Sequence, residues 1–489
     1  MKMKKVSVLI LSFFTLPFLA SAQVDSLATE WTLKQCIDYA LANSLTVKRS
    51  TYAVETSEVD YDEAKYSRLP SVNGQVSYGS SWGRGLDPVS NDFVTQQINS
   101  SNIGAQASLP LFNGMRIHSA IKQLRTANAA AEQDLAKTKN DITINVATLF
   151  INVVFNKELV ENAKYQLASS QQQLDRTKKQ VAAGSLAKSE ELNLDAQVAT
   201  NEVNLVQQEN ALALSLLQLK QALQIPASQP FDVEIPAIEP QDVMLTQSRD
   251  EVFDIAKQVM PEIKAAEYKV QSSEFAVKAA RGNLYPRLSL IGNINTNYSS
   301  AASPRRIVDE GRFLYDDSNG DGVADLDAAI GMSNGQPVYT YVQNSHMENY
   351  NARRQFEDNI YRTVTLQLSI PIFNSYQARA SVRRSVIQRE VAKVSAAETA
   401  QTLRQDVETA YNNAVASSKS YNANTRQVQA REEAFRMMKQ RYEIGAINFV
   451  EYQVSENDLY RAKSDLLRAK YDFIFRTKVL DLYQGKSIY

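Results

Sequence analysis

The chain has 489 residues, of which 44% are hydrophobic and 22% charged, and its formal net charge at pH 7 is −1. Nucleic-acid-binding domains are normally strongly basic, so this charge balance argues against a nucleic-acid partner. The single cysteine, Cys36, excludes an intrachain disulfide and a cysteine-based metal cluster.

The first 22 residues have the features of a secretory signal peptide, and we assign residues 1–22 to it. Lysines come first, an apolar stretch runs over residues 6–20, and Ala20-Ser21-Ala22 has the pattern of a cleavage site. A membrane-spanning helix needs about 20 apolar residues, whereas this stretch is shorter and contains Pro17. No run of 18 or more apolar residues follows. We therefore expect an exported protein without a transmembrane helix, either soluble or a β-barrel.

An internal repeat organises the rest of the chain. Residues 108–113 (SLPLFN) recur as residues 369–374 (SIPIFN), and the same offset of 261 relates residues 183–186 to residues 444–447. Self-similarity at a fixed offset indicates two copies of one structural unit. We assign residues 23–249 to the first repeat and residues 250–489 to the second, each with the order helix, strand, loop, strand, long helix, turn, helix.

Each repeat is predicted to contain a β-hairpin, at residues 71–111 and 287–372, and the second has a long outer loop at residues 299–359. Apolar and polar residues alternate along the strands, as in half-buried strands. Each strand has about 9 to 11 residues, the length that a tilted strand needs to cross the hydrocarbon layer. Strands of an ordinary soluble sheet are the alternative, but the hairpins are isolated within largely helical sequence and have no second sheet to pack on.

Four strands in lipid would leave two unpaired edges, and unpaired backbone groups are not tolerated there. Single-chain barrels start at eight strands. We therefore expect several subunits to share one barrel, and physical reasoning alone allows two, three or four of them.

Aromatic residues near the strand ends fit the girdles that membrane barrels carry at the two interfaces. We assign this role to Tyr78, Trp82, Phe112 and Phe373. Phe112 has a second interpretation, because with Asn113 as N-cap and Ile117 at the fourth helical position it would form a hydrophobic staple.

Two long helices are predicted at residues 114–182 and 375–444, which lack proline and internal glycine. At 1.5 Å per residue each would span roughly 100 Å. Return helices are predicted at residues 188–223 and 450–484, and the proline-marked residues 225–249 would form an equatorial segment. Shorter helices at residues 32–67 and 250–284 would complete the two repeats. A soluble coiled-coil rod is the alternative, but a rod would not need membrane-length strands.

The sequences LPLFNG (109–114), IPIFN (370–374) and YEIGA (442–446) resemble those of the TolC-like outer membrane efflux protein family, over essentially the whole mature chain. The resemblance implies an α+β membrane protein. In this family a homotrimeric 12-stranded transmembrane β-barrel, with four strands per chain, continues into a long periplasmic α-helical barrel. It also implies partners, namely a periplasmic adaptor protein and an inner-membrane pump, and a conduit that is not an enzyme.

The same resemblance implies a gate at the periplasmic hairpin tips. The family's gating tyrosine aligns with Tyr442, and its acidic gate positions align with Glu451 and with Glu190, which lies beside Glu191. Such acidic rings favour cations. The chain departs from the family pattern at Ile447 and Val454, where the type member has a gate arginine and a second aspartate. A simpler role is also available, since carboxylates in the first turn of a helix favour its positive end.

The outer loop contains a sequence that resembles a calcium loop of the D-x-N-x-D-G type. Asp317, Asn319, Asp321 and Asp325 stand at the first, third, fifth and ninth positions, while Ala328 replaces the bidentate glutamate. Either a Ca²⁺ site or a plain Asp/Gly turn fits this pattern. Apart from this Ca²⁺, no cofactor is expected.

These observations predict the outer-membrane channel of a tripartite system, with its helical part in the periplasm. Its cargo would be drugs, dyes or metal ions. No P-loop, GxGxxG or GxSxG sequence is present, so nothing indicates catalysis or energy conversion. A type I polypeptide secretion duct and a surface scaffold or adhesin without a pore are the two alternatives.

Overall fold

The structure is a computed structural model that describes residues 30–89, 91–95, 97–236, 248–313, 329–339 and 343–486. The predicted signal peptide lies outside the described residues. The chain forms two compact units. The first comprises Met1–Ala53, Glu132–Lys264 and Glu398–Tyr489, and the second comprises Val54–Ala131 and Ala265–Ala397.

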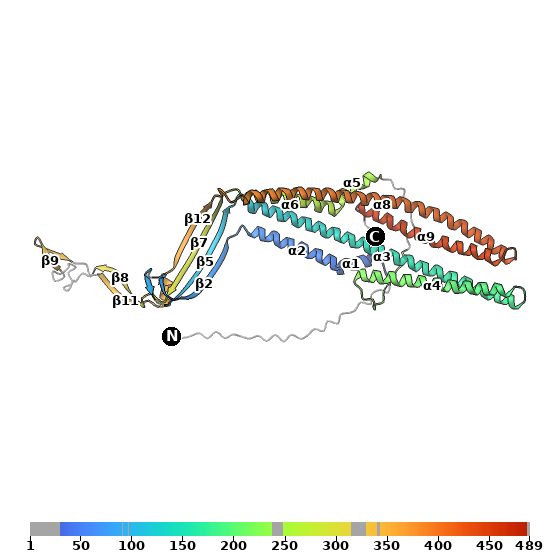
Figure 1. Ribbon diagram of the computed structural model, residues 1–489, viewed down its shortest axis with the longest axis horizontal. Helices are drawn as coiled ribbons and strands as arrows, with labels where there is room; N and C mark the ends of the chain where they lie inside the picture. The colour runs from blue at the N-terminus through green and yellow to red at the C-terminus, as the bar shows by residue number, and fades with distance from the viewer. Residues whose placement is uncertain are drawn as a thin grey trace, which may run out of the picture. The chain divides into compact units, whose positions relative to one another are not determined.

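The second unit contains one four-stranded antiparallel sheet (Figure 1), with the order β12-β7-β5-β2. Its strands are β2 (Ser71–Ser81), β5 (Ile98–Phe112), β7 (Arg287–Ser299) and β12 (Tyr361–Ser369). The last strand was expected to continue to Ile372, but it ends at Ser369. Pro371 has no backbone N–H to donate to the ladder and restricts the residue before it, which explains the earlier end.

The two faces of this sheet differ in polarity. Val364, Leu366 and Leu368 lie opposite Gly292, Leu290 and Leu288, and they are 79%, 61% and 59% exposed. Because side chains alternate between the faces of a strand, these residues share one apolar, exposed face. On the other face the four strands carry serine, asparagine, glutamine and threonine. On β7, for example, every second residue from Asn293 to Asn297 is an asparagine.

The loop predicted at residues 299–359 contains strands and a helix. Strand β8 (Arg305–Phe313) pairs with β11 (Gln343–Asn349), and β9 (Ala329–Ser333) pairs with β10 (Gln336–Tyr339). Helix α7 (Ala352–Asp358) follows and leads into β12. In the first repeat, the described residues of the corresponding connection form the short pair of β3 (Arg84–Leu86) and β4 (Phe93–Thr95).

The remaining elements are almost all helices. They are α1 (Leu33–Asn43), α2 (Leu45–Tyr66), α3 (Arg116–Ala182), α4 (Lys188–Leu223), α5 (Arg249–Val259), α6 (Pro261–Gly282), α8 (Gln377–Glu443) and α9 (Phe449–Tyr483). The two long helices, α3 and α8, have 67 residues each. The helices expected at residues 32–67 and 250–284 are each divided in two, at Ser44 and at Met260. Met260 precedes Pro261 and is extended, with ψ 129°, as a residue before proline prefers.

The joints between strand and long helix are built alike in both repeats. Gly114 and Met115 have φ of 61° and 62°, and the residues at the same offset, Ser375 and Tyr376, have φ of 50° and 67°. The side-chain oxygen of Asn113 accepts a hydrogen bond from the N–H of Ile117 at 3.4 Å. Two left-handed residues therefore delay each helix, which begins two residues later than the sequence predicted.

The core of the first unit lies where α1, α3, α4 and α9 meet. Phe150, Leu219 and Tyr471 are buried there, together with Cys36. Burial raises the pKa of the Cys36 thiol to about 12, so this residue acts as a small apolar side chain.

Helix α3 contains one 18-residue window with a mean hydropathy of 1.2, which by length and composition could cross a membrane. The sequence had shown no uninterrupted apolar run of this length. Apolar residues of α3 between Val146 and Val154 belong to the core of the first unit, and 28% of the window is buried within the protein.

Candidate functional site: the hairpin tips

In the first unit α3 and α4 form one helical hairpin, and α8 and α9 form a second (Figure 1). Both turn with the same geometry. Gly184 and Gly445 have φ of 73° and 74°, a conformation that glycine adopts without strain. The N–H of Ser185 donates to the carbonyl of Gln180 at 3.0 Å, and the N–H of Ala446 donates to the carbonyl of Arg441 at 2.8 Å. These bonds are those of a Schellman motif, which ends a helix sharply.

An aromatic cluster lies directly behind the second tip. The ring of Tyr442 stacks on that of Tyr452 with centroids 4.9 Å apart, and it lies 6.2 Å from the ring of Phe449. Phe449 and Tyr452 are buried against Leu174 and Leu194 of the first hairpin. The cluster therefore joins the two hairpins through apolar contact.

A groove with a volume of about 480 Å³ runs between the tips. It is lined by Gln173, Arg176, Gln180, Leu186, Glu190, Tyr442, Glu443, Gly445, Ile447, Asn448 and Phe449. A guanidinium nitrogen of Arg176 lies 3.9 Å from a carboxylate oxygen of Glu443. Both side chains are about half exposed or more, so this pair contributes little to stability.

Tyr442 and Glu190, both expected in a gate, are brought together in this groove. Burial raises the pKa of the Tyr442 hydroxyl, the negative charge of Glu190 raises it further, and contacts with Gln173 and Thr177 oppose the shift. Tyr442 therefore remains neutral and can donate a hydrogen bond at physiological pH. One carboxylate oxygen of Glu190, Oε2, is buried without a hydrogen-bond partner among the described residues.

The other two predicted gate carboxylates are engaged locally. Glu451 is exposed in the first turn of α9, where its carboxylate accepts a hydrogen bond from the side chain of the N-cap residue Asn448 at 3.0 Å. Glu191, in the first turn of α4, forms an ion pair with Lys188 at 2.6 Å. These positions suit the helix-start role that the sequence left open.

A polar seam that the sequence did not predict lies between α3 and α9, away from the tips. Asn162 donates to Ser464 at 3.0 Å, and Gln166 donates to Asn457 at 3.3 Å. Nearer the tip the hydroxyl of Ser169 donates to the carboxylate of Glu456 at 3.0 Å. Amide and hydroxyl side chains therefore connect one hairpin to the other along several turns.

Glu456 is the buried acid of this seam, with 8% of its surface exposed. Burial raises its pKa, while hydrogen bonds from Ser169 and Tyr452 and the charge of Lys439 oppose the shift. One feature of the sequence could have indicated this burial. Glu456 lies four residues from Tyr452 and from Tyr460, so the carboxylate shares one face of α9 with two aromatic rings.

The predicted interface aromatics are exposed in the second unit. Tyr78 and Trp82 are 71% and 75% exposed at one end of the sheet, and Phe112 and Phe373 are 46% and 86% exposed at the other. The predicted calcium ligands Asp317, Asn319, Asp321 and Asp325 lie outside the described residues. Among the residues that the structure describes, no group of three or more His, Cys, Asp or Glu residues could hold a metal ion.

Membrane-length strands with an exposed apolar face, continuous with two long helical hairpins, define an outer-membrane channel protein. The family model described as "Outer membrane efflux protein" matches residues 36–223 and 252–483, and the chain belongs to this family. The resemblance inferred from the sequence is therefore confirmed. Members are non-enzymatic outer-membrane efflux channels with their helical part in the periplasm.

The individual relatives share less than a quarter of their aligned residues with this chain. The chain is 24% identical over 285 residues to the cation efflux system protein CusC of Escherichia coli O6:H1, over 55% of this chain and 57% of CusC. It is 22% identical over 457 residues to the solvent efflux pump outer membrane protein SrpC of Pseudomonas putida, over 90% of this chain and 82% of SrpC. A crystal structure of CusC covers 93% of this chain and 92% of its own, with 19% identity and a TM-score of 0.71, which shows a shared fold. In sequence, the chain spans little more than half the length of CusC.

Proposed function

We propose that the chain is the exit duct of a tripartite efflux system, a passive channel that an adaptor protein and an inner-membrane pump open from the periplasm. The observation that carries this proposal is the sheet. One of its faces is apolar and exposed, and its outermost strands, β2 and β12, each have one edge without a partner strand among the described residues. Such a sheet is stable in lipid only if further copies pair with both edges.

Three copies would give a closed barrel of 12 strands, the homotrimer that the family resemblance implies. The length of the strands supports a span of the hydrocarbon layer. β2 has 11 residues and β12 has 9, and a tilted transmembrane strand needs about 9 to 11. In the barrel the polar face would line the lumen. Because this face carries uncharged side chains between Ser289 and Asn297 on β7, the barrel would not sort cargo by charge.

We propose small molecules as the cargo. The relatives differ in what they export, since CusC is named for cations and SrpC for solvents. A neutral lumen is compatible with both, and the pump would then select the cargo. Within this proposal the hairpin tips form the periplasmic gate, with Tyr442 and Glu190 in the groove and Glu191 and Glu451 in the adjacent first helical turns.

Single-channel conductance of the detergent-purified protein in a planar bilayer tests the proposal. We expect discrete openings that prefer cations, with a lower preference in Glu451→Gln. Glu55→Gln, which removes the charge of an exposed carboxylate on α2, is the charge-matched control. If Glu451→Gln does not change the openings or their selectivity, the assignment of an acidic gate is refuted, while the assignment as a channel stands. Well-folded protein that never inserts would instead favour a surface scaffold or adhesin.

A further inference from the structure

Helix α7 is fixed to the end of the sheet that is far from the long helices. The hydroxyl of Thr296 donates to the carbonyl of Phe356 at 2.6 Å, and the N–H of Ser299 donates to the side chain of Gln355 at 2.9 Å. The rings of Tyr298 and Phe356 lie 6.0 Å apart. Thr296 and Tyr298 alternate in step with Leu290 and Ile294, so α7 lies on the apolar face of the sheet.

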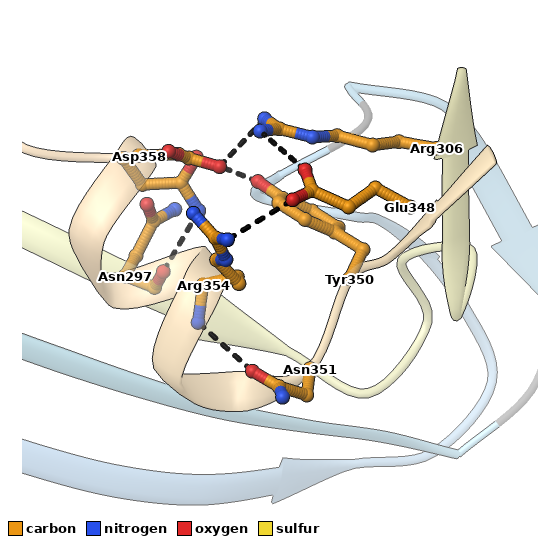
Figure 2. A network of polar contacts seen from close by, with 8 residues as sticks. Asn297, Arg306, Glu348, Tyr350, Asn351, Arg354 and Asp358 are labelled. Atoms are coloured by element: carbon orange, nitrogen blue, oxygen red, sulfur yellow. Dashed lines mark hydrogen bonds and ion pairs between the residues drawn. The ribbon is translucent and has the colours of Figure 1, made fainter. Parts of the chain in front are cut away.

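An ion-pair network holds this helix against the base of the outer hairpin (Figure 2). Arg306 lies 2.5 Å from Asp358 and 3.4 Å from Glu348, and its guanidinium lies over the ring of Tyr350 at 5.2 Å. Arg354 shares Glu348 at 3.0 Å. Each of these carboxylates therefore has a guanidinium partner within the protein, and the ion pairs fix α7 in place. Arg306 and Arg354 are engaged in this network, so any ligand would be bound by other arginines.

Two further arginines, one on α7 and one on β12, are exposed. The side chain of Arg353, on α7, is 87% exposed and pairs with Glu357, one turn along the same helix. Arg362, on β12, is exposed and lies directly opposite Ile294. Directly opposed residues project to the same face, so Arg362 lies on the face that α7 covers. Its partner Ile294 is two residues from Thr296 on β7.

The position of Arg362 along its strand gives its depth in the membrane. It directly precedes the exposed apolar series Val364, Leu366 and Leu368 on the same face. The exposed apolar residues continue through Ile370 to Ile372, and at about 3.3 Å per residue the stretch from Val364 to Ile372 covers up to roughly 26 Å, comparable with the roughly 25 Å apolar band of outer-membrane barrels. The helical part is periplasmic, so Arg362 and α7 lie beyond the outer edge of that layer, at the level of the outer headgroups. Arginines at this depth direct their guanidinium groups to the interface.

We propose that Arg353 and Arg362, presented by α7 and β12, bind the phosphate groups of the phosphorylated glycolipid in the outer leaflet. Guanidinium groups match phosphate oxygens in bidentate geometry. Charge complementarity supports this occupant, since residues 305–306 and 348–362 together carry five arginines (Arg305, Arg306, Arg353, Arg354 and Arg362) and three carboxylates (Glu348, Glu357 and Asp358). The inference rests on the proposed placement of the strands in the membrane.

The test uses the full protein in detergent, with fluorescent diphosphoryl lipid A as the probe. We expect saturable binding that weakens by at least about tenfold in the double variant Arg353→Gln/Arg362→Gln, since each lost charged contact is worth roughly a factor of ten. The control Arg436→Gln/Arg383→Gln removes the same charge from exposed positions on α8, one of them paired within its helix, and should bind as the parent does.

Three results would overturn the proposal. The double variant could bind the lipid as tightly as the parent, the control could lose as much affinity as the double variant, or the parent could bind dephosphorylated lipid as tightly as the diphosphoryl form. Displacement of the lipid by an equal concentration of inorganic phosphate would assign the site to a free anion and overturn it as well. The heat resistance of the oligomer confirms that the variants are folded. Conductance in the same preparations separates the two proposals, because a conducting protein without lipid binding refutes only this one.

Discussion

Phe449→Ala tests whether the apolar contact between the hairpins keeps the periplasmic tip closed. Phe449 is 3% exposed and packs with Leu174 and Leu194 of the first hairpin, and with Tyr442 and Tyr452 of its own. Truncation of a buried phenylalanine to alanine costs about 3–5 kcal/mol. Because its surroundings are divided between the hairpins, we assign roughly half of that cost, about 1.5–2.5 kcal/mol, to the contact that opening must break.

A change of this size shifts the balance between closed and open tips by about 10- to 70-fold. Single-channel recording in a planar bilayer without adaptor or pump measures it directly, as the fraction of time that the channel spends open. We expect this fraction to rise by at least about tenfold in Phe449→Ala.

Phe473→Ala is the matched control. Phe473 lies on the same helix, is 5% exposed, and stacks on Tyr421 at 5.9 Å within the second hairpin. We expect this variant to lower the thermal stability to a similar degree without more frequent opening. If both variants open equally often, general loosening explains the effect, and if neither does, the cluster does not hold the tip closed. Either result refutes the reasoning.

Two other predictions concern the seam and the joints. Burial raises the pKa of Glu456 above its usual 4.5, so the folded state binds this proton more tightly than the unfolded state. The contribution of Glu456 to stability should therefore be fully present below pH 4.5 and be lost as the pH rises through its native pKa. We expect Glu456→Gln to unfold at a higher temperature than the parent at pH 8 but not at pH 4. The same difference in unfolding temperature at the two pH values would contradict this. Gly114→Ala should strongly reduce the yield of heat-resistant oligomer, because its Cβ would lie 2.5 Å from the carbonyl oxygen of Gly282. Gly184→Ala has the same left-handed φ but open space around it, and a comparable loss there would show that φ alone is responsible.

The repeat made much of this fold predictable from the sequence. The alternation and spacing of apolar residues predicted the strands and the long helices. Because the two repeats are related by an offset of 261 residues, an element predicted in one copy could be placed in the other. The helix starts were predicted two residues early because left-handed φ at Met115 and Tyr376 is rare outside glycine and leaves no mark in composition. The structure of the outer loop escaped prediction because it has no counterpart in the first repeat.

The seam could not be predicted for a different reason. Ser169 and Glu456 are 287 residues apart, and only the packing of one hairpin on the other brings them together. Periodicity shows which face of a helix is apolar, but it does not show which polar residue will meet which partner. Of the predicted gate residues, the structure brings Tyr442 and Glu190 into one groove, whereas Glu451 and Glu191 have partners of their own.

The composition of the seam suits the proposed opening, in which the two hairpins would separate. Its hydrogen bonds, such as those from Asn162 to Ser464 and from Gln166 to Asn457, contribute only about 0.5–1.5 kcal/mol each, because water replaces the partner when they break. A continuous leucine seam would expose apolar area along its whole length on opening, at about 25 cal/mol per Å². Near the turn, the cluster around Phe449 and Tyr452 supplies tightly packed apolar contact. An adaptor that displaces this cluster would therefore meet little further resistance along the polar part of the seam.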